Sequence, residues 1–158
     1  LNYVKELNLS EKNRNLAHEI EKTESVAIHI RRGDYLLPQF APRYANICTV
    51  DYYQKAIDLI KTKISNCKFF IFSDDTNWVK DNLKLNDAIY VDWNRGKDSF
   101  FDMYLMSQCK HHIIANSSFS LIGALMSKHQ SQINICPQKW LNEGFKSPNI
   151  QPENWIKL

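Results

Sequence analysis

The chain reads Val26-Ala27-Ile28-His29-Ile30-Arg31-Arg32-Gly33-Asp34-Tyr35 over the stretch that decides its fold. The apolar run 26–30 has the length of a strand and predicts one that is buried on both faces. Two arginines follow where that strand should end. Ligands of open parallel sheets bind outside the carboxyl ends of the strands, and planar guanidinium groups suit phosphate. The stretch therefore predicts a site for a nucleotide or a nucleotide sugar.

Length and composition are those of an ordinary globular domain. The 158 residues are enough for one domain with a core, and 44% of them are hydrophobic and 23% charged. The 20 basic and 17 acidic residues give a net charge of +3, without a long run of one sign. Because nucleic-acid binding needs a clustered basic face, we expect no nucleic-acid partner.

Cysteine spacing and hydropathy indicate a reducing compartment. The four cysteines are widely spaced and form no C-x-x-C pair, so we expect free thiols: Cys48, Cys67, Cys109 and Cys136. No segment approaches the ~18 apolar residues of a membrane span, and the polar residues 1–24 do not resemble a signal peptide. We expect a cytoplasmic protein, with peripheral membrane association as the alternative. Leu1 in place of an initiator Met suggests a piece of a longer chain.

Helical and strand patterns alternate along the chain. We expect helices over residues 10–22, 51–65, 76–83, 98–109 and 119–127, and strands over residues 26–30, 68–72, 88–91, 112–115 and 132–136. The connection 31–49 is long enough to be a lid or a binding loop. The alternation predicts an α/β fold with a doubly wound, mainly parallel, Rossmann-like sheet. One domain should span residues 1–158, with a helical lead-in over 1–24 and a packed tail over 137–158.

Polar residues follow four of the predicted strands, and the topology should bring them to one edge of the sheet. They are His29, Arg31 and Arg32; Ser73, Asp74 and Asp75; Asp98 and Asp102; and Asn116, Ser117 and Ser118. The last set begins a helix, whose free N–H groups favour phosphate. The aspartates could orient the arginines or accept hydrogen bonds from a base such as guanine. No Gly-rich fingerprint follows the first strand, which disfavours a dinucleotide site or a Walker-type loop.

Simpler interpretations of these residues stay open. His29 could be a packed core histidine, Asp74-Asp75 a helix cap and Ser117-Ser118 a plain N-cap. We expect no metal site, because neighbouring carboxylates such as Asp74 and Asp75 point to different sides, and adjacent strand residues such as His111 and His112 face opposite ways. Arg32-Gly33-Asp34 also spells a short adhesion tripeptide, which chance readily produces.

An ordered set of motifs resembles the α-1,2-fucosyltransferases of glycosyltransferase family 11. The resemblance covers nearly the whole chain from about residue 25. Its motifs are His29-Ile30-Arg31-Arg32-Gly33-Asp34-Tyr35, Asp51-Tyr52-Tyr53-Gln54, Phe70-Ile71-Phe72-Ser73-Asp74-Asp75, Trp78-Val79-Lys80, Asp102-Met103-Tyr104-Leu105-Met106-Ser107, Cys109-Lys110-His111, Ile114-Ala115-Asn116-Ser117-Ser118-Phe119-Ser120, Pro137, Lys139-Trp140 and Pro152-Glu153-Asn154-Trp155.

The resemblance implies an inverting, metal-independent transfer of L-fucose from GDP-fucose to the 2-hydroxyl of a galactoside. It implies one half of a GT-B-type enzyme, the C-terminal half that holds GDP-fucose, with the acceptor-binding N-terminal half missing. No cofactor beyond the donor substrate is implied. By the same resemblance, the site residues are Arg31 on the β-phosphate, Arg32 in support, His29 on the nucleoside, Asp102 on guanine, Asn116, Ser117 and Ser118 at the phosphates, and Asp74 and Asp75 lining the site or fixing the arginines.

Two features leave the activity open. The family commonly carries two tryptophans where this chain has Leu121-Ile122, which bears on rate or substrate fit more than on the fold. No general base stands out, and Asp34 is the nearest carboxylate to the arginines. The alternative is a truncated or degenerate module that binds a GDP-sugar without transferring it.

Overall fold

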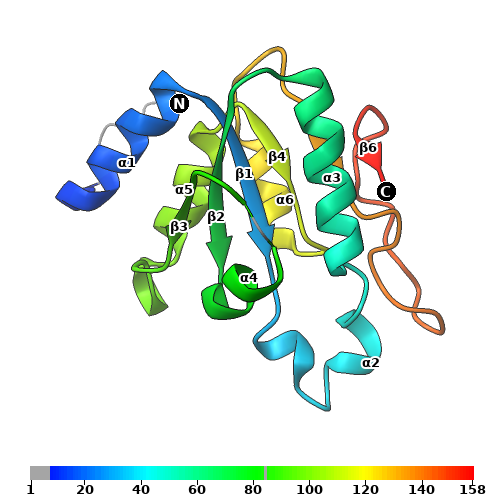
Figure 1. Ribbon diagram of the computed structural model, residues 1–158. Helices are drawn as coiled ribbons and strands as arrows, with labels where there is room; N and C mark the ends of the chain where they lie inside the picture. Colours follow the sequence, from blue (N-terminus) through cyan, green and yellow to red (C-terminus); the bar gives the residue numbers. More distant parts are fainter. Residues whose placement is uncertain (1–7, 84) are drawn as a thin grey trace.

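Six parallel strands form the centre of the molecule. The computed structural model describes residues 8–83 and 85–158. Its strands are β1 (Glu24–Ile30), β2 (Cys67–Ser73), β3 (Ala88–Val91), β4 (His111–Ile113), β5 (Asn134–Cys136) and β6 (Ile156–Lys157). They lie in the order β3-β2-β1-β4-β5-β6 (Figure 1), which is the strand order of a Rossmann-type sheet. The predicted fold class is confirmed.

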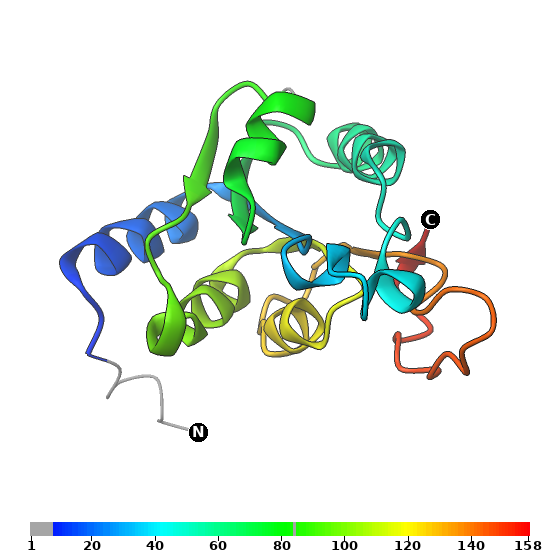
Figure 2. The same cartoon turned by 90° about the horizontal axis from the view of Figure 1, so that it is seen from below.

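Helices cover both faces of this sheet. Figure 2 shows α3 (Val50–Lys63) and α4 (Thr76–Asn82) on one side, with α1 (Glu11–Lys22), α5 (Phe100–Gln108) and α6 (Ser118–Leu125) on the other. Side chains of a strand alternate between the two faces. Ile28 and Ile71 therefore pack in the core under α3, whereas Ala27 and Phe70 pack in the core under α1 and α5. Burial on both sides explains why the sequence of β1 is continuously apolar.

The central strand β1 fixes where the functional edge lies. It pairs with β2 from Glu24 opposite Cys67 to Ile30 opposite Ser73, and with β4 on its other side. Helix α3 holds its end from one face, because the Tyr53 hydroxyl donates to the His29 carbonyl over 3.0 Å. The residues that follow β1 and β2 therefore leave the sheet side by side.

The predicted elements begin and end within two residues of their predicted bounds, and elements that were not predicted occur in the connection 31–49, before α5 and in the tail. The connection 31–49 contains a 3-10 turn, η2 (Asp34–Leu36), and a short helix, α2 (Ala41–Tyr44). Helix α5 begins two residues later than predicted, because Gly96 has a φ of 59° and opens a 3-10 turn, η3 (Gly96–Asp98). The tail contributes β6, whose Ile156 lies opposite Ile135 of β5.

Other expectations concern the tail and the cysteines. The tail packs on the domain through Trp140 and Trp155, which join Cys136 in a third apolar cluster. All four cysteines are free thiols, as predicted. In the described part of the chain, no helix combines the length and the apolar character that crossing a bilayer requires.

Candidate functional site

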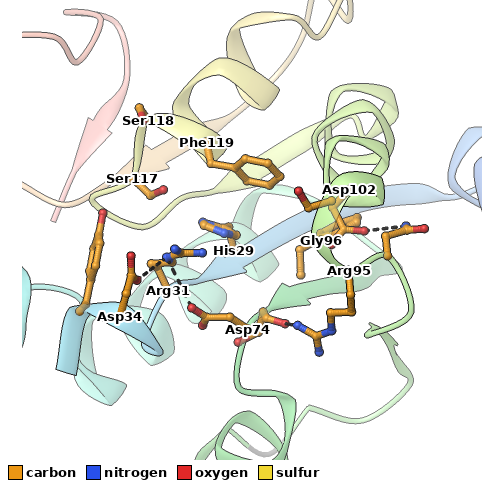
Figure 3. A pocket seen from close by; sticks show the side chains of 15 residues that line it. His29, Arg31, Asp34, Asp74, Arg95, Gly96, Asp102, Ser117, Ser118 and Phe119 are labelled. Carbon is orange, nitrogen blue, oxygen red and sulfur yellow. Dashed lines mark hydrogen bonds and ion pairs between the residues drawn. The ribbon is translucent and has the colours of Figure 1, made fainter. Parts of the chain in front are cut away.

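A cavity of about 520 Å³ lies at the carboxyl ends of β1, β2 and β4. This is the crevice where ligands bind in doubly wound sheets, because the strand order reverses between β1 and β4. Eight residues predicted from the sequence line it together (Figure 3): His29, Arg31, Asp34, Ser73, Asp74, Asp102, Ser117 and Ser118. The structure therefore brings together side chains from four separate segments of the chain.

Arg31 is held in place by two carboxylates. Its Nε donates to Oδ1 of Asp34 over 2.9 Å and lies 3.4 Å from Oδ2 of Asp74. Burial alone would lower the pKa of Arg31, but the hydrogen bond that it donates to Asp34 and the charges of Asp74 and Asp34 outweigh burial and raise that pKa. Both contacts are made at Nε, and Figure 3 shows the guanidinium between Asp34, Asp74 and His29. The carboxylates thus fix the direction of a permanently charged group that lines the cavity.

Asp74 also reaches the backbone that follows β1. Its Oδ1 accepts from the backbone N–H of Arg32 over 2.9 Å, so one carboxylate ties the end of β2 to the end of β1. Gly33 makes this approach possible. A Cβ at Gly33 would lie 2.8 Å from Oδ2 of Asp74, which is closer than van der Waals contact allows.

Ser117 and Ser118 place the start of α6 at the cavity. The Leu121 N–H donates to the Ser117 carbonyl over 3.0 Å and begins the helix. Within the described residues, the Ser117 side chain makes no capping hydrogen bond, so the plain N-cap interpretation does not describe it. The first N–H groups of a helix have no partner inside the helix, and its dipole is positive at that end. The start of α6 can therefore receive an anion beside Arg31.

The other end of the cavity carries Asp102 and Arg95. The Asp102 carboxylate accepts from the Asn94 side-chain amide over 2.7 Å. Burial raises the pKa of Asp102 to about 6, while the Asn94 hydrogen bond and the Arg95 charge oppose that rise. Figure 3 shows Asp102 and Arg95 away from Ser117 and Asp34. The cavity thus has one end built for an anion and one end with a carboxylate that can accept N–H groups.

His29 forms part of the cavity wall between these ends. It is buried, and its ring centre lies 5.6 Å from that of Phe119. Burial, with a smaller contribution from the Arg31 charge, lowers the pKa of His29 to about 3, so the ring is neutral at pH 7. Among the described residues, its Nδ1 is the one buried side-chain nitrogen or oxygen without a hydrogen-bond partner. A buried polar atom of this kind is costly unless a ligand or water completes it.

Four residues predicted at this edge do not line the cavity. Asp98 is exposed in η3, and the other three, Arg32, Asp75 and Asn116, make contacts elsewhere. Arg32 stacks on Trp78, with Cζ 3.8 Å from the ring centre, and its Nε donates to Asp75 over 3.3 Å. Asp75 also accepts from the Trp78 N–H and so caps α4. Asn116 donates from its side chain to two backbone carbonyls. These contacts give all three residues structural roles, and their contact with a nucleotide stays a prediction.

Several residues of the cavity wall were not predicted. Asn94, Arg95 and Gly96 follow β3 in a segment that the sequence presents only as a polar loop. Tyr35 lies in the connection after β1, and Phe119 lies in the predicted helix 119–127. The only sequence signal for Arg95 is a basic residue within the polar loop after β3, which does not single it out. Its Nη1 donates to the Ser73 carbonyl over 3.4 Å, which places its chain across the ends of two strands.

The histidine pair of β4 lies apart from this cavity, at the start of the strand. His111 faces Glu24 at 3.8 Å, whereas the ring nitrogens of His112 contact Asn134 and the Met106 carbonyl. In residues 8–83 and 85–158, no three His, Cys, Asp or Glu side chains gather in a metal-binding group.

Comparison with known proteins identifies a family. A family model described as glycosyl transferase family 11 matches residues 3–158. The chain is 37% identical to an alpha-1,2-colitosyltransferase of Escherichia coli over 96% of this chain and 53% of that protein. It is 35% identical to the O-antigen biosynthesis glycosyltransferase WbnK of Escherichia coli over 87% of this chain and 46% of that protein.

A mammalian relative is more distant. The galactoside 2-alpha-L-fucosyltransferase SEC1 of Bos taurus is 26% identical over 65% of this chain and 28% of that protein. The chain spans about half the length of the two bacterial relatives.

Proposed function

Because the chain belongs to glycosyltransferase family 11, we propose that its cavity binds GDP-fucose as the donor of a fucosyl transfer. In the complete protein the fucose passes to the 2-hydroxyl of a galactoside acceptor, with inversion at the anomeric carbon. The observation that carries the proposal is the pairing of Arg31 with the start of α6 at one end of the cavity and Asp102 at the other. An anion-binding end and a carboxylate end in one cavity suit a ligand that carries a diphosphate and a purine base.

The anion end would hold the diphosphate. Arg31 is fixed by Asp34 and Asp74 at Nε, which leaves the rest of its planar fork for phosphate oxygens. Ser117 and Ser118 offer hydroxyl groups and the first N–H groups of α6 from the opposite wall. Two donors on opposite sides would clamp the diphosphate and set the direction of the sugar.

The carboxylate end would hold the base. Guanine presents adjacent N–H donors, and Asp102 is a half-buried acceptor whose orientation is fixed by Asn94. A carboxylate there favours guanine over bases that present an acceptor at the same edge. His29, with its unpartnered Nδ1, lies on the wall between the two ends and would contact the nucleoside.

The proposed reaction is a direct displacement. The acceptor oxygen forms a bond to the anomeric carbon of fucose while the bond from that carbon to the β-phosphate oxygen breaks, and GDP leaves with the electron pair. Negative charge grows on the β-phosphate, where Arg31 would stabilise it. Asp34 lines the same cavity and would accept the proton of the acceptor hydroxyl.

A second donor is favoured by one comparison. The relative that is 37% identical over nearly the whole chain is named as a colitosyltransferase. GDP-colitose is therefore the alternative donor, held by the same diphosphate and guanine contacts. Parallel titrations with GDP-fucose and GDP-colitose separate the two, since the true donor should bind more tightly and be consumed.

Arg31→Ala tests the diphosphate site. We expect GDP affinity, measured by calorimetry, to fall on the order of 100-fold, because two charge-assisted hydrogen bonds are lost. Arg31→Lys keeps the charge but loses the planar guanidinium, so its GDP affinity should lie between those of wild type and Arg31→Ala. Arg43→Ala removes an exposed arginine outside the cavity and serves as the control. Unchanged GDP affinity in a folded Arg31→Ala variant would refute the site.

A transfer assay separates the enzyme from a binding module. With GDP-fucose and lactose we expect fucosylated lactose and free GDP in equal amounts. Tight GDP binding without turnover in the complete protein would favour the module that binds a GDP-sugar without transferring it. Absence of GDP binding would overturn both.

A further inference from the structure

A second cleft, of about 280 Å³, adjoins the donor cavity. The two share Asp34, Tyr35 and Ser118. The remaining wall of the second cleft is mostly aromatic and comes from Phe40, Tyr44 and Trp140. Nothing in the assignment of the donor cavity uses these three rings.

Hydrogen bonds hold the aromatic wall in a fixed arrangement. Tyr35 and Tyr44 stack with ring centres 4.7 Å apart, and the Tyr35 hydroxyl donates to the Asn116 carbonyl over 3.0 Å. The Asn116 side-chain amide donates to the carbonyls of Tyr44 and Trp140, each over 3.2 Å. Asn116, which also lines the cleft, therefore positions rings from three segments of the chain.

The tail reinforces the same wall. The Asn142 side-chain amide donates to the carbonyls of Pro42 and Ala45, which bracket the end of α2. Figure 2 shows α2 beside the tail loop. Phe40, directly before α2, nevertheless remains 41% exposed. A well-anchored segment thus presents an aromatic ring to solvent at the mouth of a cleft.

The chemistry of the cleft suits a neutral sugar. Its lining combines aromatic rings with one carboxylate, one side-chain amide and a few hydroxyl groups, and it contains no lysine or arginine, so it is not a second anion site. The C–H face of a β-galactopyranose packs on aromatic rings, and its hydroxyl groups bond to carboxylate and hydroxyl oxygens. Small-ligand sites commonly combine apolar walls with a few polar groups in this way.

We infer that this cleft holds the acceptor saccharide, with a galactopyranose ring against Phe40 and the reacting hydroxyl directed at Asp34. The inference rests on the proposed transfer, because it assigns the cleft to the second substrate of that reaction. The shared wall at Asp34 is what lets an acceptor hydroxyl meet a sugar in the donor cavity. Acceptor contacts are then built into this chain rather than confined to a separate half.

Phe40→Ala tests the cleft directly. Lactose binding to the 158-residue chain is followed by saturation-transfer NMR with GDP present, and GDP affinity is measured by calorimetry on the same samples. We expect Phe40→Ala to weaken lactose binding at least fivefold and to leave GDP affinity within twofold. Phe40→Trp should restore lactose binding, because a ring is what the sugar needs.

Phe100→Ala is the matched control, since Phe100 is 44% exposed but lines neither cavity. It should leave lactose binding unchanged. The inference would be overturned if lactose binding does not respond to Phe40→Ala, or if no lactose binding is seen at 20 mM (a concentration on the order of weak sugar affinities). Either result counts regardless of the measured GDP affinity. Loss of GDP binding in wild type with Phe40-dependent lactose binding would instead overturn the donor assignment and keep the cleft.

Discussion

Gly33 shows how a single residue sets the geometry of the anion end. It lies between Arg32 and Asp34, with a φ of −31° and a ψ of −84°. The Asp74 carboxylate lies so close to Gly33 that a Cβ there would be 2.8 Å from its Oδ2. The same Asp74 carboxylate contacts Arg31 and the backbone of Arg32. Displacing that carboxylate would therefore release the guanidinium that is proposed to grip phosphate.

We expect Gly33→Ala to weaken GDP binding about tenfold in a folded protein, because the new methyl group pushes Asp74 away from Arg31. Calorimetry gives the affinity and thermal unfolding reports the fold. Gly144→Ala is the control: Gly144 has a φ of 88° with open space around its Cβ position. That change should lower the melting temperature through backbone strain alone. Equal GDP affinity in Gly33→Ala and wild type would contradict the role given to Asp74.

At this scale the sequence was most informative where a charge follows a buried strand. Arg31 and Asp74 follow β1 and β2 directly and line the cavity, whereas Asp102 reaches it from the first turn of α5. Arg32 and Asp75 carry the same signal but turn toward Trp78, because consecutive residues leave a strand in different directions. Arg95 could not be singled out, since its position depends on how the loop after β3 folds back over Ser73.

The role of helix α1 is the one that the sequence indicates least. The helix reads as a thin amphipathic lead-in, yet its Asn13 is buried and exchanges hydrogen bonds with the Asn94 amide. Asn13 also accepts from the Trp93 indole N–H over 2.7 Å. Because Asn94 in turn donates to Asp102, α1 supports the end of the cavity assigned to guanine.

Asn13→Ala should lower the free energy of unfolding by about 2–3 kcal/mol, because it leaves the buried Asn94 amide and the half-buried Trp93 indole N–H without this partner. GDP affinity should also fall several-fold as Asn94 loses its anchor. Chemical denaturation and calorimetry measure the two effects. Asn15→Ala, an exposed asparagine of the same helix, should change the free energy of unfolding by less than about 0.5 kcal/mol. An unaltered GDP affinity in Asn13→Ala would mean that Asp102 does not need this support.

Long periodic elements were predicted, whereas β6 and the short helices of the connection 31–49 were not. Helix α3 has a Thr49 cap that bonds the Tyr52 N–H and apolar residues at helical spacing, so local signals are sufficient. Strand β6 has two residues, and α2 has four with a proline near its start. Such elements form because Asn142, Trp140 and β5 hold them from outside, and a single stretch of sequence does not carry those contacts.

The molecule as a whole contains buried groups whose titrations oppose one another. Burial lowers the pKa of His29 to about 3 and that of His112 to about 4, whereas a histidine in the unfolded chain has a pKa of about 6.5. The unfolded state therefore takes up these protons first, and the native state loses stability as the pH falls. Asp102 acts in the other direction, because its native pKa of about 6 exceeds the unfolded value of about 3.9.

Between about pH 6 and pH 4, each of these groups changes the free energy of unfolding by up to about 1.4 kcal/mol per pH unit. Asp102→Asn removes the opposing group, so its stability should fall more steeply on acidification than that of wild type, by about that amount per unit. Urea denaturation at half-unit intervals measures both curves. Asp98→Asn, an exposed aspartate nearby, should run parallel to wild type. Parallel curves for Asp102→Asn would show that its carboxyl is not buried as described.

The parallel sheet gives its two edges different freedom to change. The groups proposed to bind substrates lie at the carboxyl edge, where hydrogen bonds join distant segments, such as Arg32 to Asp74 and Tyr35 to Asn116. The turns that enter β2 and β5, at residues 64–66 and 128–132, lie at the opposite edge and line neither substrate cavity. Insertions, affinity tags and fluorescent labels are tolerated best at exposed turns of this kind. The turn at residues 128–132 can therefore be lengthened, or can carry a fluorescent label, without changing the substrate cavities at the other edge.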